Sequence, residues 1–194
     1  MSLRGIALNI ERGIEQLLAA KAVYDKLGIT FWLSGGTLLG AIRDGGLMEW
    51  DSDIDLTIMA DDYSEDLVKE MEKSFVVTPI HYGLGRTTVF DLNHKPRPRI
   101  NNFLAFHVPK QKLFVRVFPP FSSSLVHVIP EKYFLDERYE EMLGTKFRVY
   151  SEAETVLASQ YGDWKTRVED GFAWKDNWPK GRLSDYSGDI VCKK

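Results

Sequence analysis

Three aspartates occupy every second position of "WDSDIDL", at residues 51, 53 and 55. Alternate residues of a strand point to the same face, so Asp53 and Asp55 should project together while Ile54 and Leu56 turn into the core. Two carboxylates on one face repel each other unless a hard cation lies between them. Mg2+ takes one or two protein carboxylates and keeps room for water and substrate phosphates. The spacing therefore predicts that Asp53 and Asp55 bind Mg2+ or Mn2+.

A glycine pair lies upstream in "SGGTLLGAIR" and opens a run with helical spacing. Backbone without a Cβ can approach a ligand closely, and a helix N-terminus offers free N–H groups to an anion. A Gly-Gly pair alone usually marks a turn, and Asp-x-Asp alone is common in acidic loops. The order strand, glycine pair, helix, turn, acidic strand returns both motifs to one end of a sheet. Their combination predicts a phosphate cradle facing a metal-binding strand.

The longer stretch "SGGTLLGAIRDGGLMEWDSDIDL" resembles the signature of the LicD family of phosphotransferases, which includes fukutin and fukutin-related protein, within the nucleotidyltransferase superfold. A later "YGDW" after a helix and the segment "HVIPEKYF" are also similar to this family. The resemblance implies that Gly35, Gly36 and Thr37 bind phosphate or nucleotide, and that Asp53 and Asp55 form the catalytic metal site. It also implies that Arg43 is a fixed catalytic-site residue, with Trp50 and Asp51 beside the aspartates. The later motif consists of Tyr161, Gly162, Asp163 and Trp164.

Family members move a phosphorylated alcohol, such as phosphocholine or an alditol phosphate, from a CDP-linked donor to a glycan hydroxyl. The resemblance thus implies a Mg2+-dependent transferase, with a CDP-linked donor and a glycan or glycolipid acceptor as partners. The reaction would be an in-line displacement at phosphorus, in which metal ions neutralise charge on the leaving nucleotide. Tyr161 and Trp164 would stack a base or sugar, or pack against the core.

The sequence departs from the family pattern at Arg116. The superfold adds a third acidic residue, which in LicD relatives lies in a "V-D-hydrophobic-F-P" strand, and here the comparable segment is "FVRVFPP". Arginine neither binds a metal nor acts as a base at neutral pH. Asp91 or Asp163 could replace the missing carboxylate, or Arg116 could pair with the aspartates or a substrate phosphate.

This departure leaves three functions open. One is the phosphotransferase; the second is a degenerate, weak or inactive relative that binds nucleotide or glycan without turnover. The third is a nucleotidyltransferase that adds NMP to a small molecule or protein. Absence of the Lys-Ser/Thr ending of a P-loop counts against an ordinary NTPase.

The elements around these motifs predict an α+β (α/β) fold with a mixed sheet flanked by helices. A helix is expected over 6–27, ending at Gly28, and a short strand over 29–34 leads into the glycine pair. Four strand-like segments follow between residues 76 and 118, and Ser151 with Glu154 forms a capping box for a further helix. The predicted domain spans 1–165, with an N-terminal helix at 1–28 and the core motif at 29–60; residues 166–194 are expected to form a C-terminal extension.

Composition excludes several other classes. The 194 residues carry a formal net charge of −3, so a nucleic-acid-binding surface is not expected. No apolar run approaches the 18 or so residues of a transmembrane helix, and the sequence predicts a cytoplasmic protein. The lone cysteine, Cys192, cannot form an internal disulfide. The four histidines lack the paired spacing of a zinc site. The basic loop 94–99 has two interpretations: it gathers phosphates, or it is a solvated loop, which is the commoner case for such runs.

Overall fold

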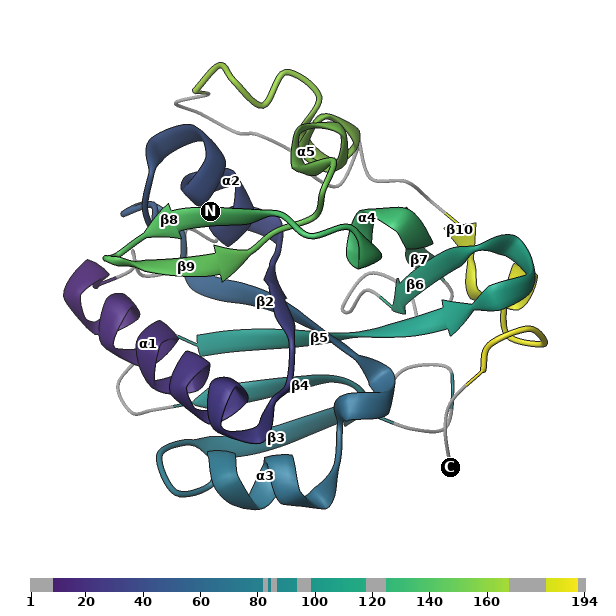
Figure 1. Cartoon of the computed structure of the whole chain (residues 1–194), viewed down its shortest axis with the longest axis horizontal. Helices are drawn as coiled ribbons and strands as arrows, with labels where there is room; N and C mark the ends of the chain where they lie inside the picture. Colours follow the sequence, from purple (N-terminus) through teal and green to yellow (C-terminus); the bar gives the residue numbers. More distant parts are fainter. Residues whose placement is uncertain are drawn as a thin grey trace, which may run out of the picture.

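The computed structural model describes residues 9–81, 84, 87–93, 99–117, 125–167 and 181–191. In this part of the chain, one mixed eight-stranded sheet carries helices on both faces, and a two-stranded hairpin lies beside it (Figure 1). This architecture confirms the predicted fold class. The sheet contains β1 (Phe31–Leu33), β2 (Asp53–Met59), β3 (Val76–His81), β4 (Thr87–Asn93), β5 (Arg99–Val108), β6 (Leu113–Val117), β7 (Leu125–Pro130) and β10 (Gly181–Arg182).

Five α-helices and three 3-10 turns are described. The α-helices are α1 (Ile10–Leu27), α2 (Gly35–Asp44), α3 (Glu65–Met71), α4 (Glu131–Leu135) and α5 (Ala153–Tyr161). The 3-10 turns are η1 (Ala60–Asp62), η2 (Pro109–Gln111) and η3 (Leu183–Asp185), and the hairpin strands are β8 (Tyr139–Met142) and β9 (Thr145–Arg148).

The long strand β5 organises the sheet. On one side it pairs in parallel with β2, the strand that carries Asp53 and Asp55. On its other side it pairs antiparallel with β4 over its first half and with β6 over its second half. The predicted strands of the middle region are therefore present and antiparallel, and the parallel β2–β5 pair is the exception that makes the sheet mixed.

The N-terminal elements follow the sequence signals closely. Helix α1 ends at Gly28, which adopts the left-handed conformation (φ +67°) that glycine tolerates. Helix α2 begins at Gly35 and ends at Gly45 in the same conformation (φ +72°). The apolar alternation of β2 buries Ile54, Leu56 and Ile58 completely. Local chemistry therefore sets the boundaries of this region.

Helix α5 was predicted correctly, but its predicted capping box is wrong. The N-cap is Glu152, and no side chain caps the helix. Instead, both carboxylate oxygens of Glu154 accept hydrogen bonds from Arg138, at 2.6 and 2.7 Å. A charged, bidentate partner is stronger than a backbone cap, which explains the difference.

The two faces of the sheet have different roles. On one face, Tyr24 of α1 donates a hydrogen bond to Asn102 of β5 at 2.6 Å, so α1 covers that face. Asn101, the residue before it in β5, points to the opposite face, towards Asp53 and Asp55. Helices α2 and α5 pack together on the side of the aspartates (Figure 1). The acidic site therefore lies between β2–β5 and the α2–α5 pair.

The C-terminal segment also contributes to the sheet. Strand β10 pairs with β7, Leu183 is buried in the core, and Val191 forms a bridge with His107. The division into residues 1–165 and a C-terminal extension stays a prediction, but residues 181–191 pack against the same sheet. Within the described residues, no helix is long and apolar enough to cross a membrane. Most of the basic loop 94–99, together with Cys192, lies outside those residues.

Candidate active site

The glycine pair is held against the acidic strand by backbone hydrogen bonds at Asp55. The Asp55 amide donates to Thr37 Oγ1 at 2.9 Å, and the Asp55 carbonyl accepts from the Ser34 amide at 3.0 Å. Both ends of the turn that begins α2 are thereby tied to one residue of β2. The two predicted halves of the site are brought together in this way.

The glycines are required by space as well as by conformation. A Cβ on Gly35 would overlap the Asp55 carboxylate, and a Cβ on Gly36 would overlap that of Asp51. Gly35 also has a φ of +50°, which disfavours other residues. Each glycine therefore makes room for one acidic side chain.

The N-terminus of α2 has no side-chain cap. Ser34 is the N-cap residue, yet its hydroxyl accepts a hydrogen bond from Arg116 and lies 3.4 Å from the Tyr150 hydroxyl. The first N–H groups of a helix have no intrahelical partner. The start of α2 can thus offer backbone donors and the positive end of its dipole to an anion.

Asn101 joins the two predicted metal-binding aspartates. It lies directly opposite Asp55 in the parallel β2–β5 ladder. Its amide nitrogen donates to Asp53 Oδ2 and to Asp55 Oδ1, at 2.9 Å each. Arg99 also approaches Asp53 Oδ2 at 3.5 Å. The Asn101 amide thus holds the two carboxylates close together.

The acidic side chains perturb one another. Burial, followed by the charge of Asp53, raises the pKa of Asp51 to about 6. Burial and the charges of Asp53 and Asp51 raise the pKa of Asp55 well above its ordinary value, opposed by the Asn101 hydrogen bond and the charge of Arg116. The site therefore concentrates more negative charge than its protein surroundings neutralise.

This arrangement fits a divalent cation. The donor set consists of hard oxygens, and the glycine turn lets the carboxylates of Asp55 and Asp51 lie directly against its backbone, where a Cβ would overlap them. Across the described residues, three or more acidic, histidine or cysteine side chains do not come together in a way that would hold a metal. The site therefore suits a cation that takes two carboxylates and completes its shell with other oxygens.

Arg116 lies on the same face of the sheet as the aspartates but makes different contacts. Its side chain is 1% exposed. The guanidinium donates to Ser34, to Thr57 Oγ1 at 2.6 Å, and to His127 Nδ1 at 2.7 Å. The charge of Arg116 lowers the pKa of Asp55 without a hydrogen bond between the two side chains among the described contacts. Arg116 is thus a buried counter-charge behind the acidic site.

His127 is part of this buried cluster. Arginine only donates, so His127 Nδ1 must accept from Arg116 and the ring proton lies on Nε2. Burial, then the charge of Arg116, lowers the pKa of His127 well below its ordinary value. His127 is therefore neutral, which is consistent with a structural role.

Tyr161 at the end of α5 lies near the acidic site. Burial raises the pKa of Tyr161 well above its ordinary value, and the charges of Asp55 and Asp51 raise it further. This tyrosine is a member of the later family motif. The fold thus joins that motif to the aspartates through the packing of α5 on α2.

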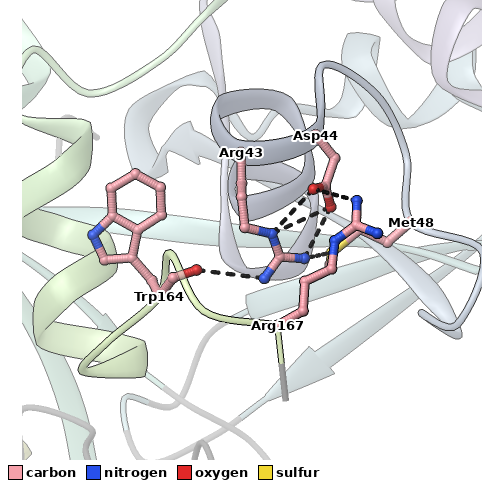
Figure 2. A network of polar contacts seen from close by, with 5 residues as sticks. All are labelled: Arg43, Asp44, Met48, Trp164 and Arg167. Atoms are coloured by element: carbon pink, nitrogen blue, oxygen red, sulfur yellow. Dashed lines mark hydrogen bonds and ion pairs between the residues drawn. The ribbon is translucent and has the colours of Figure 1, made fainter. Parts of the chain in front are cut away.

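Arg43 lies at the opposite end of α2 from the glycine pair. It donates to Asp44 from Nη2 at 2.9 Å and to the Trp164 carbonyl at 3.4 Å, and Arg167 approaches Asp44 at 2.8 Å (Figure 2). Its contacts connect the C-terminus of α2 to the segment after α5, so its geometry supports a positioning role.

Trp50 lies exposed between these arginines. The ring is 59% exposed, with the Arg43 guanidinium 5.9 Å and the Arg167 guanidinium 5.4 Å from its centroid. Both distances are within the range of cation–π attraction. Trp50 therefore borders the site next to Asp51 without being part of the core.

The two candidate replacement carboxylates lie in different places. Asp91 of β4 is opposite Asn101 in the sheet, so one strand separates it from Asp55. Arg99 lies between Asp91 and Asp53, at 3.4 and 3.5 Å. Asp163 is on an exposed turn, where it accepts a hydrogen bond from Thr166 at 2.7 Å. Asp91 is thus on the face of the sheet that carries the site.

Several site residues were missed by sequence reasoning. One signal was available: "RINNFLAF" places two asparagines in an apolar strand, and buried amides need hydrogen-bond partners. The others come from separate elements, and their spacing in the sequence carries no signal. The missed residues are Ser34, Thr57, Arg99, Asn101, His127 and Tyr150.

The sheet and the glycine–aspartate site together define a nucleotidyltransferase-fold protein. A solved structure of the lincosamide antibiotic adenylyltransferase LnuA, lincomycin-bound, superposes with a TM-score of 0.54 over 84% of this chain and 94% of that one. The sequences are 14% identical, so the likeness concerns the fold alone. The family model "LicD/FKTN/FKRP, nucleotidyltransferase domain" matches residues 28–147. The chain belongs to this family.

Curated relatives match over about a third of this chain. Ribitol-5-phosphate transferase FKTN of Mus musculus is 38% identical over 69 residues, 36% of this chain and 14% of that protein. Lipopolysaccharide cholinephosphotransferase LicD of Haemophilus influenzae is 36% identical over 63 residues, 32% of this chain and 22% of that protein. The chain thus matches less than a quarter of the length of either relative.

Proposed function

We propose that this chain is a metal-dependent transferase that moves a phospho-alcohol from a CDP-linked donor to a hydroxyl of a glycan or glycolipid. The observation that carries the proposal is the glycine turn packed against Asp55 and Asp51, with Asp53 beside them. This arrangement provides an uncapped helix terminus for phosphate and paired carboxylates for a cation. The names of the relatives, which refer to ribitol 5-phosphate and to choline phosphate transfer, support this substrate class.

Asp53 and Asp55 would hold Mg2+ or Mn2+, which supplies charge neutralisation for the donor phosphates. The first-turn amides of α2 bind a phosphate oxygen, because they have no side-chain cap. The glycine pair lets the carboxylates of Asp55 and Asp51 lie against the start of this helix, so that the cation and the phosphate would be close together. Arg116 holds Ser34 at the start of this helix. These residues therefore bind and orient the donor before the acceptor hydroxyl attacks phosphorus.

A test of the proposal measures CMP release from CDP-choline, CDP-ribitol and CDP-glycerol with Mg2+. Asp53→Asn should lower CMP release at least a hundredfold, whereas Asp66→Asn on the distant helix α3 should leave it unchanged. Binding of a donor without CMP release from any of them would contradict the transferase.

Arg116 favours a second function, a relative that binds nucleotide or glycan without turnover. Arg116 is a buried guanidinium, and the family resemblance implies an acidic side chain at this position. Donor binding without turnover in the same assay would support this alternative. Transfer of NMP from an NTP would instead support the nucleotidyltransferase. The cytoplasmic location, the donor alcohol and the acceptor stay predictions.

A further inference from the structure

Asn101 is placed by the sheet where a third metal ligand could act. The parallel register sets it opposite Asp55, and its amide lies 2.9 Å from one carboxylate oxygen of Asp53 and one of Asp55. Its neighbour Asn102 points to the other face, where it bonds to Tyr24 and to the Phe90 carbonyl. Of these two asparagines, Asn101 alone contacts the acidic pair.

The amide of Asn101 carries a donor and an acceptor on the same planar group. Its N–H2 group donates to both carboxylates and offsets the repulsion between them. A cation between them removes that repulsion and also repels the N–H2 group. Half a turn of the amide would replace the nitrogen with the carbonyl oxygen, which is a ligand that hard cations accept.

We propose that Asn101 is the third protein ligand of the metal site, through its side-chain oxygen, and that it exchanges its hydrogen bonds to Asp53 and Asp55 for this role when a cation binds. The inference rests on the metal-dependent function proposed above. It assigns the third position to a neutral amide on β5, and not to a carboxylate on β6, where Arg116 lies.

A neutral third ligand has a consequence for affinity. Asp53, Asp55 and an amide present two negative charges to the cation, whereas three carboxylates would present three. The metal alone should therefore bind weakly, and the donor phosphates should contribute a large share of the remaining ligands. Asn101→Asp should add a third negative charge and strengthen the binding of the metal alone.

The test measures Mn2+ binding to the full chain without nucleotide, by titration calorimetry or electron paramagnetic resonance. Asn101→Asp should tighten Mn2+ binding at least tenfold, and Asn101→Leu should weaken it at least tenfold. Gln111→Glu is the control, because it also replaces an amide with a carboxylate but lies on the exposed turn η2, beyond the far end of β5 from Asn101; it should change the affinity less than threefold. Asn101→Ser replaces the leucine variant if that protein does not fold.

The variants separate a ligand from a residue that only holds the carboxylates. Aspartate keeps an oxygen but loses the N–H2 donor. A purely positioning role therefore predicts weaker binding in N101L and, in N101D, a gain of less than threefold from the added charge, because loss of the donor lets Asp53 and Asp55 move apart. That result, or unchanged binding in N101L, would overturn the inference and leave the transferase proposal intact. Failure of the wild-type chain to bind Mn2+ would overturn both. If the wild-type chain released no CMP from any donor, but its Mn2+ affinity still changed as expected in the Asn101 variants, only the transferase proposal would be overturned.

Discussion

At the scale of single residues, Gly36 makes room for the carboxylate of Asp51. We expect Gly36→Ala to displace Asp51, because the added Cβ would overlap its carboxylate. Donor turnover should fall at least tenfold, and the unfolding free energy should fall by about 1–3 kcal/mol, as for other overpacked sites. Gly46→Ala is the control, since a Cβ at Gly46 meets nothing within 4 Å. Equal CMP release and equal thermal stability in both variants would contradict this role.

Asp51 should make the metal-free protein less stable as the pH rises. Its pKa is about 6 in the folded chain against an ordinary 3.8, so the folded state binds a proton more readily than the unfolded state between these values. The contribution of Asp51 to the unfolding free energy is therefore fully present below about pH 4 and is lost as the pH rises through about 6. The decline should be on the order of 1–3 kcal/mol.

Urea unfolding between pH 4 and pH 7 measures the effect of Asp51. In Asp51→Asn the decline should be smaller, because asparagine does not titrate. A saturating concentration of Mg2+ should also flatten the wild-type profile, since a cation favours the ionised carboxylates. An identical profile in the wild type and Asp51→Asn would show that this aspartate does not carry the pH dependence.

At the scale of elements, α2 is held at both ends by different chemistry. Its N-terminus is tied to β2 through Asp55, and its C-terminus is tied through Arg43 to the segment after α5 (Figure 2). The glycine pair and Tyr161 are therefore positioned by the same two helices. A residue distant from the aspartates can thus influence the geometry of the site.

Arg43→Ala should loosen the α2–α5 pair. The arginine is 12% exposed and contacts Asp44, Met48 and Trp164, so its loss should cost about 1–3 kcal/mol of unfolding free energy. The hydrogen bond from Arg43 is the main cause that lowers the pKa of Asp44, so this pKa should rise in the variant. NMR titration of the Asp44 carboxyl and chemical unfolding measure both effects.

Arg167→Ala provides the control for Arg43, because Arg167 contacts the same Asp44 but is 63% exposed. It should lower stability by less than about 0.5 kcal/mol, as expected for an exposed ion pair. If both variants lost the same stability, the tie between α2 and the Trp164 segment would have no special role.

At the scale of the whole molecule, the C-terminal segment closes one edge of the sheet. Strand β10 pairs with β7, and Leu183 fills a core position at 6% exposure. Leu183→Ala should therefore lower the unfolding free energy by about 2–3 kcal/mol. Leu135→Ala, at a position 56% exposed, should have little effect in the same urea titration. Equal stability in the two variants would indicate that residues 181–191 form a separate extension.

The sequence alone determined the local structure of the site. Glycines with positive φ end α1 and α2, and the alternation of β2 turns Ile54, Leu56 and Ile58 inward while Asp53 and Asp55 share a face. These features depend on residues close together in the chain, so periodicity and turn chemistry reveal them. The family membership is confirmed by the match over residues 28–147, and the main motif of the resemblance lies in the same contiguous stretch.

Only the tertiary structure decided which residues surround the aspartates. Asn101 reaches them because β5 pairs in parallel with β2. Arg116 contacts Ser34, Thr57 and His127 because β6 and β7 follow β5 in the sheet and the register turns its side chain to the face of the site. A shift of one residue in either pairing would turn these side chains to the other face. Strand register across long stretches of chain is set by the packing of the whole core, and for that reason residue spacing alone did not reveal these partners.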